Sequence, residues 1–451
     1  MNLYGPVRAD KGVGTGKATV TLSMNWKGTP VASTTHTVRV LDAPSLKELA
    51  VSSRLVRSLP HPDRKVMVPI VRFTPERTLF AVGYPSGVIQ SWDLASGKEL
   101  RRIDAPKGQR SILDFVQTTA DFRTLFVPVE VGKVVRDEKD PKKPIRVEYE
   151  GKILVWDLAT GKPKPDLQAL PGHGVSNAYV SPDGSRLITT ERPGVVQGEK
   201  NRPNVVRMID TAKGRSWKLA EGDGMAAFAP DGKRVYVAMS DNPEAKGDGL
   251  LVFDYEGKEQ PPLVAPGKQT FTHPSISPDG KRLVVSASKP GGNHPGSLKV
   301  FDLATGKEIA DFVAGGDSPL PVPFSLDGRL LATGDDDGKV KVFDVAKRSF
   351  VLEHEFVGCR VGRGTAFSKD GRRLAVSVQE KTKEEGRPQD PLDQPQPRIY
   401  LFDLSKPKSA PEEIVCPHGA MGQVAFSADD KTLAFGSTGA VHLFDVSGPA
   451  K

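Results

Sequence analysis

The stretch ISPDGKRLVVSASKPGGNHPGSLKVFDLATGK, residues 276–307, holds the two signals that decide the fold of this 451-residue chain. Its first turn, residues 277–280, leads into the β-rich run 282–286. Pro presets the first turn position and Asp-Gly completes a tight hairpin, so the turn joins two antiparallel strands. Its second half ends on Phe301-Asp302, followed by a turn in which Gly306 can take positive φ. The stretch therefore predicts short antiparallel strands.

Both signals recur along the chain and alternate strictly. The turn signal occurs eight times, in copies that begin at Phe73, Gln117 (a degenerate copy), Val180, Phe228, Ile276, Phe324, Phe367 and Phe426. The second signal occurs eight times, as Trp92-Asp93, Trp156-Asp157, Ile209-Asp210, Phe253-Asp254, Phe301-Asp302, Phe343-Asp344, Phe402-Asp403 and Phe444-Asp445. Successive aspartates are 42 to 64 residues apart. Four strands per period of this length are typical of a β-propeller.

The repeat units resemble those of bacterial WD-repeat propellers over residues 46–451. The resemblance implies an all-β propeller of eight four-stranded blades, with seven blades plus a stray unit as the alternative. The chain departs from the family in three ways. Two of the eight aromatic-Asp pairs are Trp-Asp, the Gly-His pair survives only as Gly172-His173, and the hairpin Asp between second and third strands is best kept at Asp337. We therefore expect apolar packing to replace most of the family's buried His-Ser-Trp-Asp hydrogen-bond network.

The two ends of the chain raise separate expectations. The chain ends on the third strand of the last unit, so residues 46–59 are expected to supply its outer strand and close the ring. Residues 1–45 do not fit the repeat, but alternation over 18–24 and the run 35–41 predict two strands. This stretch resembles the closing strands of an immunoglobulin-like sandwich. A hairpin packed on the propeller wall is the alternative.

Composition argues against several classes of protein. The net charge of +8 comes from 63 Lys and Arg against 55 Asp and Glu spread along the chain, whereas nucleic-acid binders usually concentrate positive charge on one face. The chain contains no run of 18 apolar residues, so no membrane span is predicted. The two cysteines, Cys359 and Cys416, cannot form a disulfide framework, which favours a reducing compartment.

Five insertions all fall between the second and third strands of a repeat, at residues 131–151, 191–204, 240–249, 289–296 and 379–398. In a WD-type propeller these hairpins open on one face, and insertions on one face often mark binding. The candidate partner-binding residues are Arg136, Lys142, Lys143, Arg146, Arg192, Lys200, His294, Lys381 and Arg387. Their mixture with acidic residues favours a protein partner over a phosphate groove. For any single insertion, a drifted loop is the alternative.

Three sequence patterns resemble functional motifs, but each lacks a residue that its motif requires. Residues 12–17 lack the first Gly and the closing hydroxyl of a phosphate-binding loop. His354-Glu355 is followed by Gly358 where a zinc protease needs its second His. Residues 335–338 resemble a calcium loop, but Thr333 occupies the first ligand position. We expect no catalytic residue, metal or cofactor.

The most economical interpretation is a non-enzymatic, monomeric interaction module with a protein partner. One alternative is an enzyme, lactonase- or dehydrogenase-like, in the central channel. Another is the binding part of a larger exported protein, which would begin upstream of Met1; otherwise a cytoplasmic location is expected. Deleting residues 136–148 should leave stability nearly unchanged, because such a loop lies outside the packed blades, and should impair binding.

Overall fold

The computed structural model divides the chain into two compact units, residues 1–52 and residues 53–451. The structure describes residues 16–26, 29–40, 52–62, 66–74, 78–84, 88–104, 110–111, 116–136, 145–199, 202–240, 249–265, 269–288, 297–313, 320–381, 395–417 and 419–448. Within these residues all regular secondary structure is β-strand. The predicted division at residue 45 falls among residues 41–51, which lie outside the described part.

The first unit contains one antiparallel hairpin. Strand β1 (Gly16–Trp26) pairs with β2 (Thr29–Val40), from Gly16↔Val40 at one end to Trp26↔Thr29 at the other. The two predicted strands are therefore present, and both are longer than the alternating residues alone suggested. The likeness to an immunoglobulin sandwich stays a prediction.

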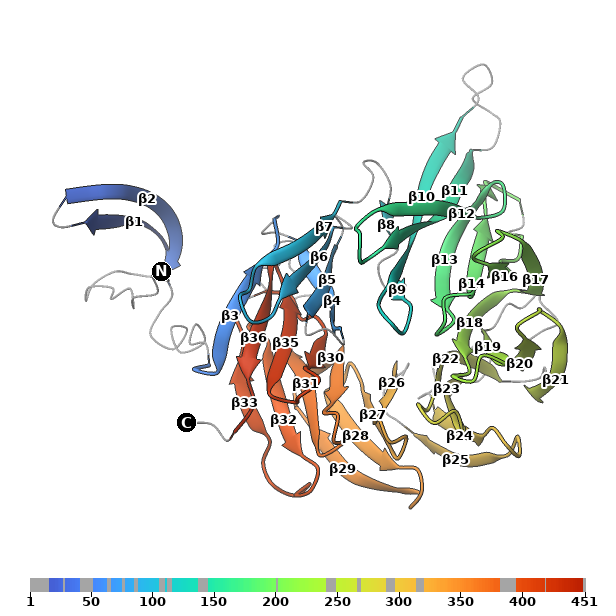
Figure 1. Cartoon of the computed structure of the whole chain (residues 1–451). Helices are drawn as coiled ribbons and strands as arrows, with labels where there is room; N and C mark the ends of the chain where they lie inside the picture. The colour runs from blue at the N-terminus through green and yellow to red at the C-terminus, as the bar shows by residue number, and fades with distance from the viewer. Residues whose placement is uncertain are drawn as a thin grey trace. The chain divides into compact units, whose positions relative to one another are not determined.

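The described strands of the second unit form eight antiparallel sheets, which we number 1 to 8 (Figure 1). Sheets 1 to 4 contain, in turn, β4 (Met67–Phe73), β5 (Thr78–Tyr84), β6 (Ile89–Asp93) and β7 (Glu99–Ile103); β8 (Arg110–Ser111), β9 (Gln117–Thr118), β10 (Thr124–Val135), β11 (Arg146–Asp157), β12 (Pro163–Gln168) and β15 (Val195–Val196); β13 (His173–Val180), β14 (Arg186–Pro193), β16 (Val205–Asp210) and β17 (Ser216–Glu221); and β18 (Asp223–Phe228), β19 (Arg234–Ser240), β20 (Gly249–Asp254) and β21 (Glu259–Val264).

Sheets 5 to 8 contain, in turn, β22 (Thr270–Ile276), β23 (Arg282–Ser288), β24 (Ser297–Asp302) and β25 (Glu308–Val313); β26 (Leu320–Phe324), β27 (Leu330–Gly334), β28 (Lys339–Asp344) and β29 (Ser349–Glu355); β30 (Cys359–Phe367), β31 (Arg373–Glu380), β32 (Arg398–Asp403) and β33 (Glu412–Val415); and β34 (Val424–Phe426), β35 (Thr432–Ser437), β36 (Ala440–Asp445) and β3 (Leu55–Pro60). Sheet 8 thus joins both ends of the unit, because β3 pairs antiparallel with β36.

The two sequence signals are hydrogen-bonded turns. In the turn signal, Ser277 Oγ donates to Asp279 Oδ1 at 2.6 Å, and the backbone N–H of Arg282 donates to Ser277 Oγ at 3.0 Å. In the second signal, every aspartate side chain accepts a backbone N–H two or three residues further on: Asp93, Asp157, Asp210, Asp254, Asp302, Asp344, Asp403 and Asp445. The signals recur because each sheet needs both turns.

The hairpin between β27 and β28 corrects one expectation. Asp337 is exposed, and the carboxylate that closes this turn belongs to the buried Asp335, which accepts the backbone N–H groups of Asp337 and Lys339 at 2.9 Å each. Gly338 follows with φ +83°. In a run of three aspartates, sequence spacing alone does not decide which one turns inward.

Eight apolar clusters fill the spaces between consecutive sheets. One contains Val342 of sheet 6 and Leu374 of sheet 7, both fully buried. Another joins Leu59 and Val441 of sheet 8 to Val71 and Trp92 of sheet 1. Each fully buried side chain of this size stabilises the fold by about 1.5–3 kcal/mol. Packing between sheets therefore provides most of the core.

Arginines add polar links between neighbouring sheets that the sequence analysis missed. The first residues of three second strands, Arg186, Arg282 and Arg373, occupy the same place in their repeats. Each donates to a backbone carbonyl of the following sheet's turns: Arg186 Nε to Tyr255 O at 2.7 Å, Arg282 Nη1 to Gly328 O at 3.0 Å, and Arg373 Nη1 to Val446 O at 2.5 Å. Because each is a charge-assisted bond, it holds adjacent turns in a fixed relation.

Candidate functional site

Two kinds of loop lie beside each other in the second unit. The hairpin between the second and third strands of a sheet bonds through its backbone to a connector between sheets. Examples are Gly194 N to Gly172 O at 3.1 Å, Phe356 N to Gly338 O at 2.9 Å and Cys416 N to Pro397 O at 3.1 Å. We call these hairpins and connectors together the loop face. It is the face on which the sequence placed the insertions.

The prediction that the first insertion, residues 131–151, is a loop is wrong for residues 131–135 and 146–151, which are strand; residues 137–144 lie outside the described part. Strands β10 and β11 pair without a register break from Thr124↔Asp157 to Val135↔Arg146, so these two strands project beyond the other strands of sheet 2 (Figure 1). The charges that suggested a loop alternate with apolar residues, and that period of two forms a strand. The second insertion, residues 191–204, is also partly strand, since β14 continues to Pro193 and β15 follows.

Strand β15 leaves the hairpin of sheet 3 and pairs with β11 of sheet 2, with Val195 opposite Val147 and Val196 opposite Arg146. We call residues 131–135, 146–151 and 195–196 the wing. It is a three-stranded extension of the loop face.

One side of the wing carries a row of three valines. Val134 lies opposite Val147, and Val147 lies opposite Val195, so all three side chains project from the same side. Val134 is 62% exposed and Val195 is 40% exposed. Isolated exposed valines are ordinary, but a row across three strands forms an apolar surface that nothing in the described residues covers.

The base of the wing is fixed by an arginine of sheet 3. Arg192 donates from Nη2 to the buried Glu130, and its guanidinium lies 4.5 Å from the centre of the Tyr149 ring. Gly174 packs against both partners, with the position of an added Cβ only 3.2 Å from Tyr149 Cγ. The wing is therefore anchored to two sheets rather than to its own hairpin alone.

Beneath this anchor lies a fully buried ion pair. Arg207 Nη1 donates to both carboxylate oxygens of Glu191, at 3.0 and 2.9 Å, and Thr189 Oγ1 donates to the same carboxylate at 2.8 Å. The backbone N–H of Leu170, in the connector, completes the set at 2.8 Å. His173, the remnant of the family's Gly-His pair, is only half-buried, and its Nδ1 contacts Pro171 O at 2.9 Å. The connector of this repeat is thus held by a Glu-Arg network.

The structure separates the predicted partner-binding residues into groups. Arg136 and Arg146 are exposed at the two strand ends of the wing tip. Arg192 serves the anchor, and Lys381 Nζ lies 3.1 Å from Asp337 Oδ1 on the loop face. Five others fall outside the described residues: Lys142, Lys143, Lys200, His294 and Arg387. The valines, which the sequence analysis did not select, are the residues that the structure brings together.

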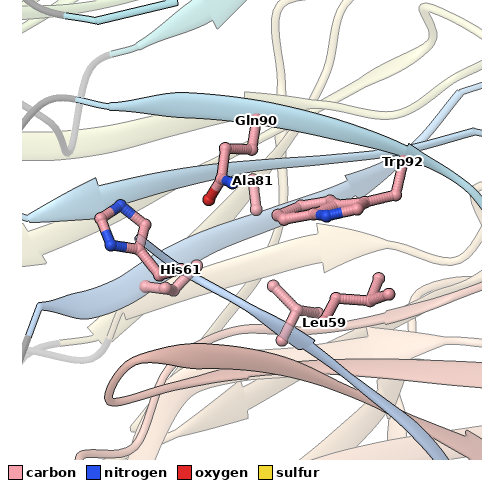
Figure 2. A pocket seen from close by; sticks show the side chains of 7 residues that line it. Leu59, His61, Ala81, Gln90 and Trp92 are labelled. Atoms are coloured by element: carbon pink, nitrogen blue, oxygen red, sulfur yellow. The ribbon is translucent and has the colours of Figure 1, made fainter. Parts of the chain in front are cut away.

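A small space lies between sheets 8 and 1, lined by Leu59, His61, Ala81, Gln90 and Trp92 among others (Figure 2). Its lining is mostly apolar and belongs to the cluster that packs these sheets. Gln90 Nε2 is directed to Glu99 at 2.5 Å. The arrangement is that of two packed sheets.

Groups suited to chemistry are scattered. Within the described ranges, no three His, Cys, Asp or Glu side chains gather closely enough to hold a metal ion. Burial raises the pKa of both thiols, Cys359 and Cys416, which disfavours the reactive thiolate. The part of the chain that the structure describes also contains no helix of the length and apolarity needed to cross a membrane.

Comparison with known proteins agrees with this architecture. Residues 322–344, in sheet 6, match the family described as WD domain, G-beta repeat. The β-propeller domain of Cps50 (Swd1) from Myceliophteria thermophila superposes with a TM-score of 0.52 at 14% identity, over 87% of this chain and 99% of that one. The C-terminal WD40 domain of Sif2 gives 0.57 at 12% identity, over 88% and 100%. The chain has a WD40-type β-propeller fold.

Two further proteins are similar to this chain, one in structure and one in sequence. The computationally designed Ika8 protein superposes with a TM-score of 0.54 at 16% identity, over 86% of this chain and all of that one. WD repeat-containing protein SL1-17 of Schistosoma mansoni is 28% identical over 179 residues, which are 38% of this chain. The match spans 55% of that relative, about half its length. These likenesses concern the fold and leave the bacterial affinity a prediction.

Proposed function

We propose that the second unit is a ring of eight blades closed by β3, and that it acts as a non-enzymatic scaffold binding a protein through the loop face and the wing. Support for the ring comes from the eight apolar clusters between consecutive sheets, one of which joins sheet 8 to sheet 1. The pairing of β3 with β36 supports closure in the same way. Domains of this fold generally act as protein-interaction scaffolds.

One observation carries the binding proposal: the loop face is where exposed apolar side chains gather. Among the described residues seven large hydrophobic side chains are exposed, and four of them, Val134, Val135, Val195 and Val357, lie in the wing or in a connector. Val357 is 85% exposed. Apolar side chains surrounded by polar ones are typical of a protein contact, and among the residues that the structure describes no comparable set of polar groups suggests a small-molecule site.

The mixed charge around these valines favours a protein over nucleic acid. Lys133 pairs with Glu150 at 2.6 Å, and Lys381 with Asp337. Neutralised pairs of this kind do not form the continuous positive stripe that a phosphate backbone requires.

The test is quantitative affinity capture from source-cell lysate with three matched proteins. The wing variant carries Val134→Asp and Val195→Asp, and the control carries Leu326→Asp. Leu326 is also exposed, but lies in a turn between first and second strands, away from the loop face. We expect a specific protein to be retained by the wild type and the control and reduced at least about tenfold by the wing variant, a loss of about 1.4 kcal/mol. Equal capture by all three would contradict the proposal.

A further inference from the structure

The chain passes from sheet 3 to sheet 2 at Gly194. Strand β14 pairs with β13 of sheet 3 until this point, where the backbone N–H of Gly194 donates to Gly172 O at 3.1 Å. The two residues of β15 follow directly and pair with β11 of sheet 2. The backbone N–H of Gln197 then donates to Ile145 O at 2.8 Å. One extended segment therefore connects the ladder of sheet 3 to the wing.

The backbones of the two sheets touch at this joint because glycines leave room for the contact. An added Cβ at Gly194 would lie 2.5 Å from Val147 O, and one at Gly151 would lie 2.8 Å from His173 O. Both distances are shorter than those at which real Cβ atoms approach other atoms. Neither glycine has a positive φ, so the close approach of the backbones is what requires them. Any other residue would separate the wing from sheet 3.

Arg192 strengthens the same joint through its side chain. It belongs to β14 of sheet 3, whereas both of its partners, Glu130 and Tyr149, belong to sheet 2. An arginine uses its charge and its flat face at the same time, which fixes its geometry more closely than a lysine's. The sequence analysis selected Arg192 as a partner-binding residue. Its contacts within the chain favour a different role.

We propose that Arg192, Gly194 and β15 position the wing for binding, although they do not contact the partner themselves. This inference rests on the proposed binding function and assigns the control of the wing to sheet 3. A two-stranded ribbon is only marginally stable by itself, so a partner would have to order it on binding and would lose affinity. A wing whose orientation is fixed beforehand avoids that loss.

The first experiment compares Gly194→Ala with the control Gly448→Ala. An added Cβ at Gly448 has no atom within 4 Å, and this glycine also lacks a positive φ. Hydrogen exchange measured by mass spectrometry reports on the wing strands. Capture from source-cell lysate reports on the protein that is retained through Val134 and Val195.

We expect Gly194→Ala to keep the wild-type thermal midpoint, because the apolar clusters between sheets are unchanged. We expect its wing strands to exchange faster and its capture to fall at least about tenfold. The control should match the wild type in all three measurements. Capture by Gly194→Ala at the wild-type level, or a loss of capture without faster exchange, overturns the proposal.

The second experiment restores the joint with a disulfide between β11 and β15. The hydrogen bond between Gln197 and Ile145 marks a hydrogen-bonded pair of the ladder, so the adjacent pair, Arg146 and Val196, is a non-hydrogen-bonded pair. The Cα atoms of such a pair lie about 4.5 Å apart, which is within the range that a disulfide spans. Arg146→Cys and Val196→Cys therefore allow β15 to be cross-linked to β11 by oxidation.

This cysteine pair is introduced into Gly194→Ala and into Arg192→Lys, which keeps the charge beside Glu130. Oxidised and reduced forms of each protein are alkylated before capture, so that the free thiols of Cys359 and Cys416 are treated alike. We expect oxidation to restore capture in both backgrounds and to change little in the chain with the cysteine pair alone. Equal capture by the two forms of Gly194→Ala overturns the proposal. Capture by Arg192→Lys that oxidation does not restore would mean that Arg192 contacts the partner directly.

The two proposals fail in different ways. If capture depends on Val134 and Val195 but is unchanged in Gly194→Ala and Arg192→Lys, the binding face stands and the positioning role is wrong. If none of these substitutions changes capture, the proposed function is wrong and the positioning role is wrong with it.

Discussion

At the scale of single residues, the repeat depends on short side chains that bond to nearby backbone. Hydrogen bonds from the Thr305 hydroxyl and backbone hold the pKa of Asp302 below its usual value. Aspartates of this kind contribute stability above their unfolded pKa of about 3.8–3.9, and that contribution is lost as the pH falls through their lowered folded pKa. The sequence identified these aspartates because a local turn needs only residues close together in the chain. It missed Glu191 and Arg207, because a buried pair depends on which strands become neighbours.

His442 predicts a second, separate response to pH. Its ring is buried in sheet 8, Nδ1 lies 2.9 Å from Ser58 Oγ, and burial lowers its pKa to about 4. The unfolded chain therefore takes up a proton at His442 below about pH 6.5, while the folded chain resists until about pH 4. Stability should fall as pH decreases through this window. We expect a smaller loss of thermal midpoint between pH 7 and pH 4.5 in His442→Gln, measured by differential scanning fluorimetry. Parallel pH curves for the two proteins would assign the acid sensitivity to other groups.

The buried pair of Glu191 and Arg207 predicts a large mutational effect. Arg207→Ala leaves the Glu191 carboxylate buried without its arginine, and breaking such a pair typically costs about 3–5 kcal/mol. Arg215 provides a control, because it is exposed and lies in the turn between β16 and β17. We expect Arg215→Ala to change the free energy of unfolding by under about 0.5 kcal/mol in urea titration. A cost for Arg207→Ala as small as the control's would show that Glu191 finds other partners.

At the scale of elements, the sequence predicted strand order better than strand length. Hairpin turns mark where strands meet, so all eight second-strand and third-strand pairs follow from the repeat signals. The wing was taken for a loop because its many charges suggested solvent exposure. The structure shows that charge and strand are compatible, since Lys133 and Glu150 pair across the side of the hairpin that lacks the valine row. The crossing of β15 into sheet 2 has no local signal, because two valines are too short a run to predict a strand.

This correction changes the expected result of a deletion. Removing residues 136–148 would take away Arg146 and Val147, which pair with both β10 and β15, so we now expect that variant to lose stability. Replacing residues 136–145 by Asn-Gly keeps the register of β10 and β11 and supplies a tight hairpin link. We expect the replacement to unfold within about 0.5 kcal/mol of the wild type in urea, and the longer deletion to unfold earlier. Equal stability of the two variants would mean that the wing strands add nothing to the fold.

At the scale of the whole molecule, the two ends of the second unit depend on each other through sheet 8. The sequence predicted that an early strand completes the last unit, although it placed that strand over 46–59 where β3 occupies Leu55–Pro60. The repeats indicated that the last unit lacks its outer strand, because the chain ends on the third strand of that unit. Its exact position depended on pairing with β36, nearly the whole chain away.

Two truncations test this dependence. Removing residues 1–52 takes away the first unit alone, and we expect the thermal midpoint of the remainder to be nearly unchanged. Removing residues 1–60 also takes away β3, including the buried Leu59, and exposes the edge of β36. Losing one buried leucine costs about 2–5 kcal/mol, and an exposed edge promotes association. Calorimetry and size-exclusion chromatography should separate the two truncations. Similar behaviour of both would make β3 dispensable.

The pairing of β3 with β36 also constrains how the protein is made. Leu55 leaves the ribosome early, but its partner Phe444 is added 389 residues later, roughly 20–80 s at the usual 5–20 residues per second. During that interval the other sheets can form from neighbouring segments, while β3 and Leu59 wait without their partner strand. Completion of sheet 8 therefore has to wait for the synthesis of β36, and until then β3 lacks the strand with which it pairs.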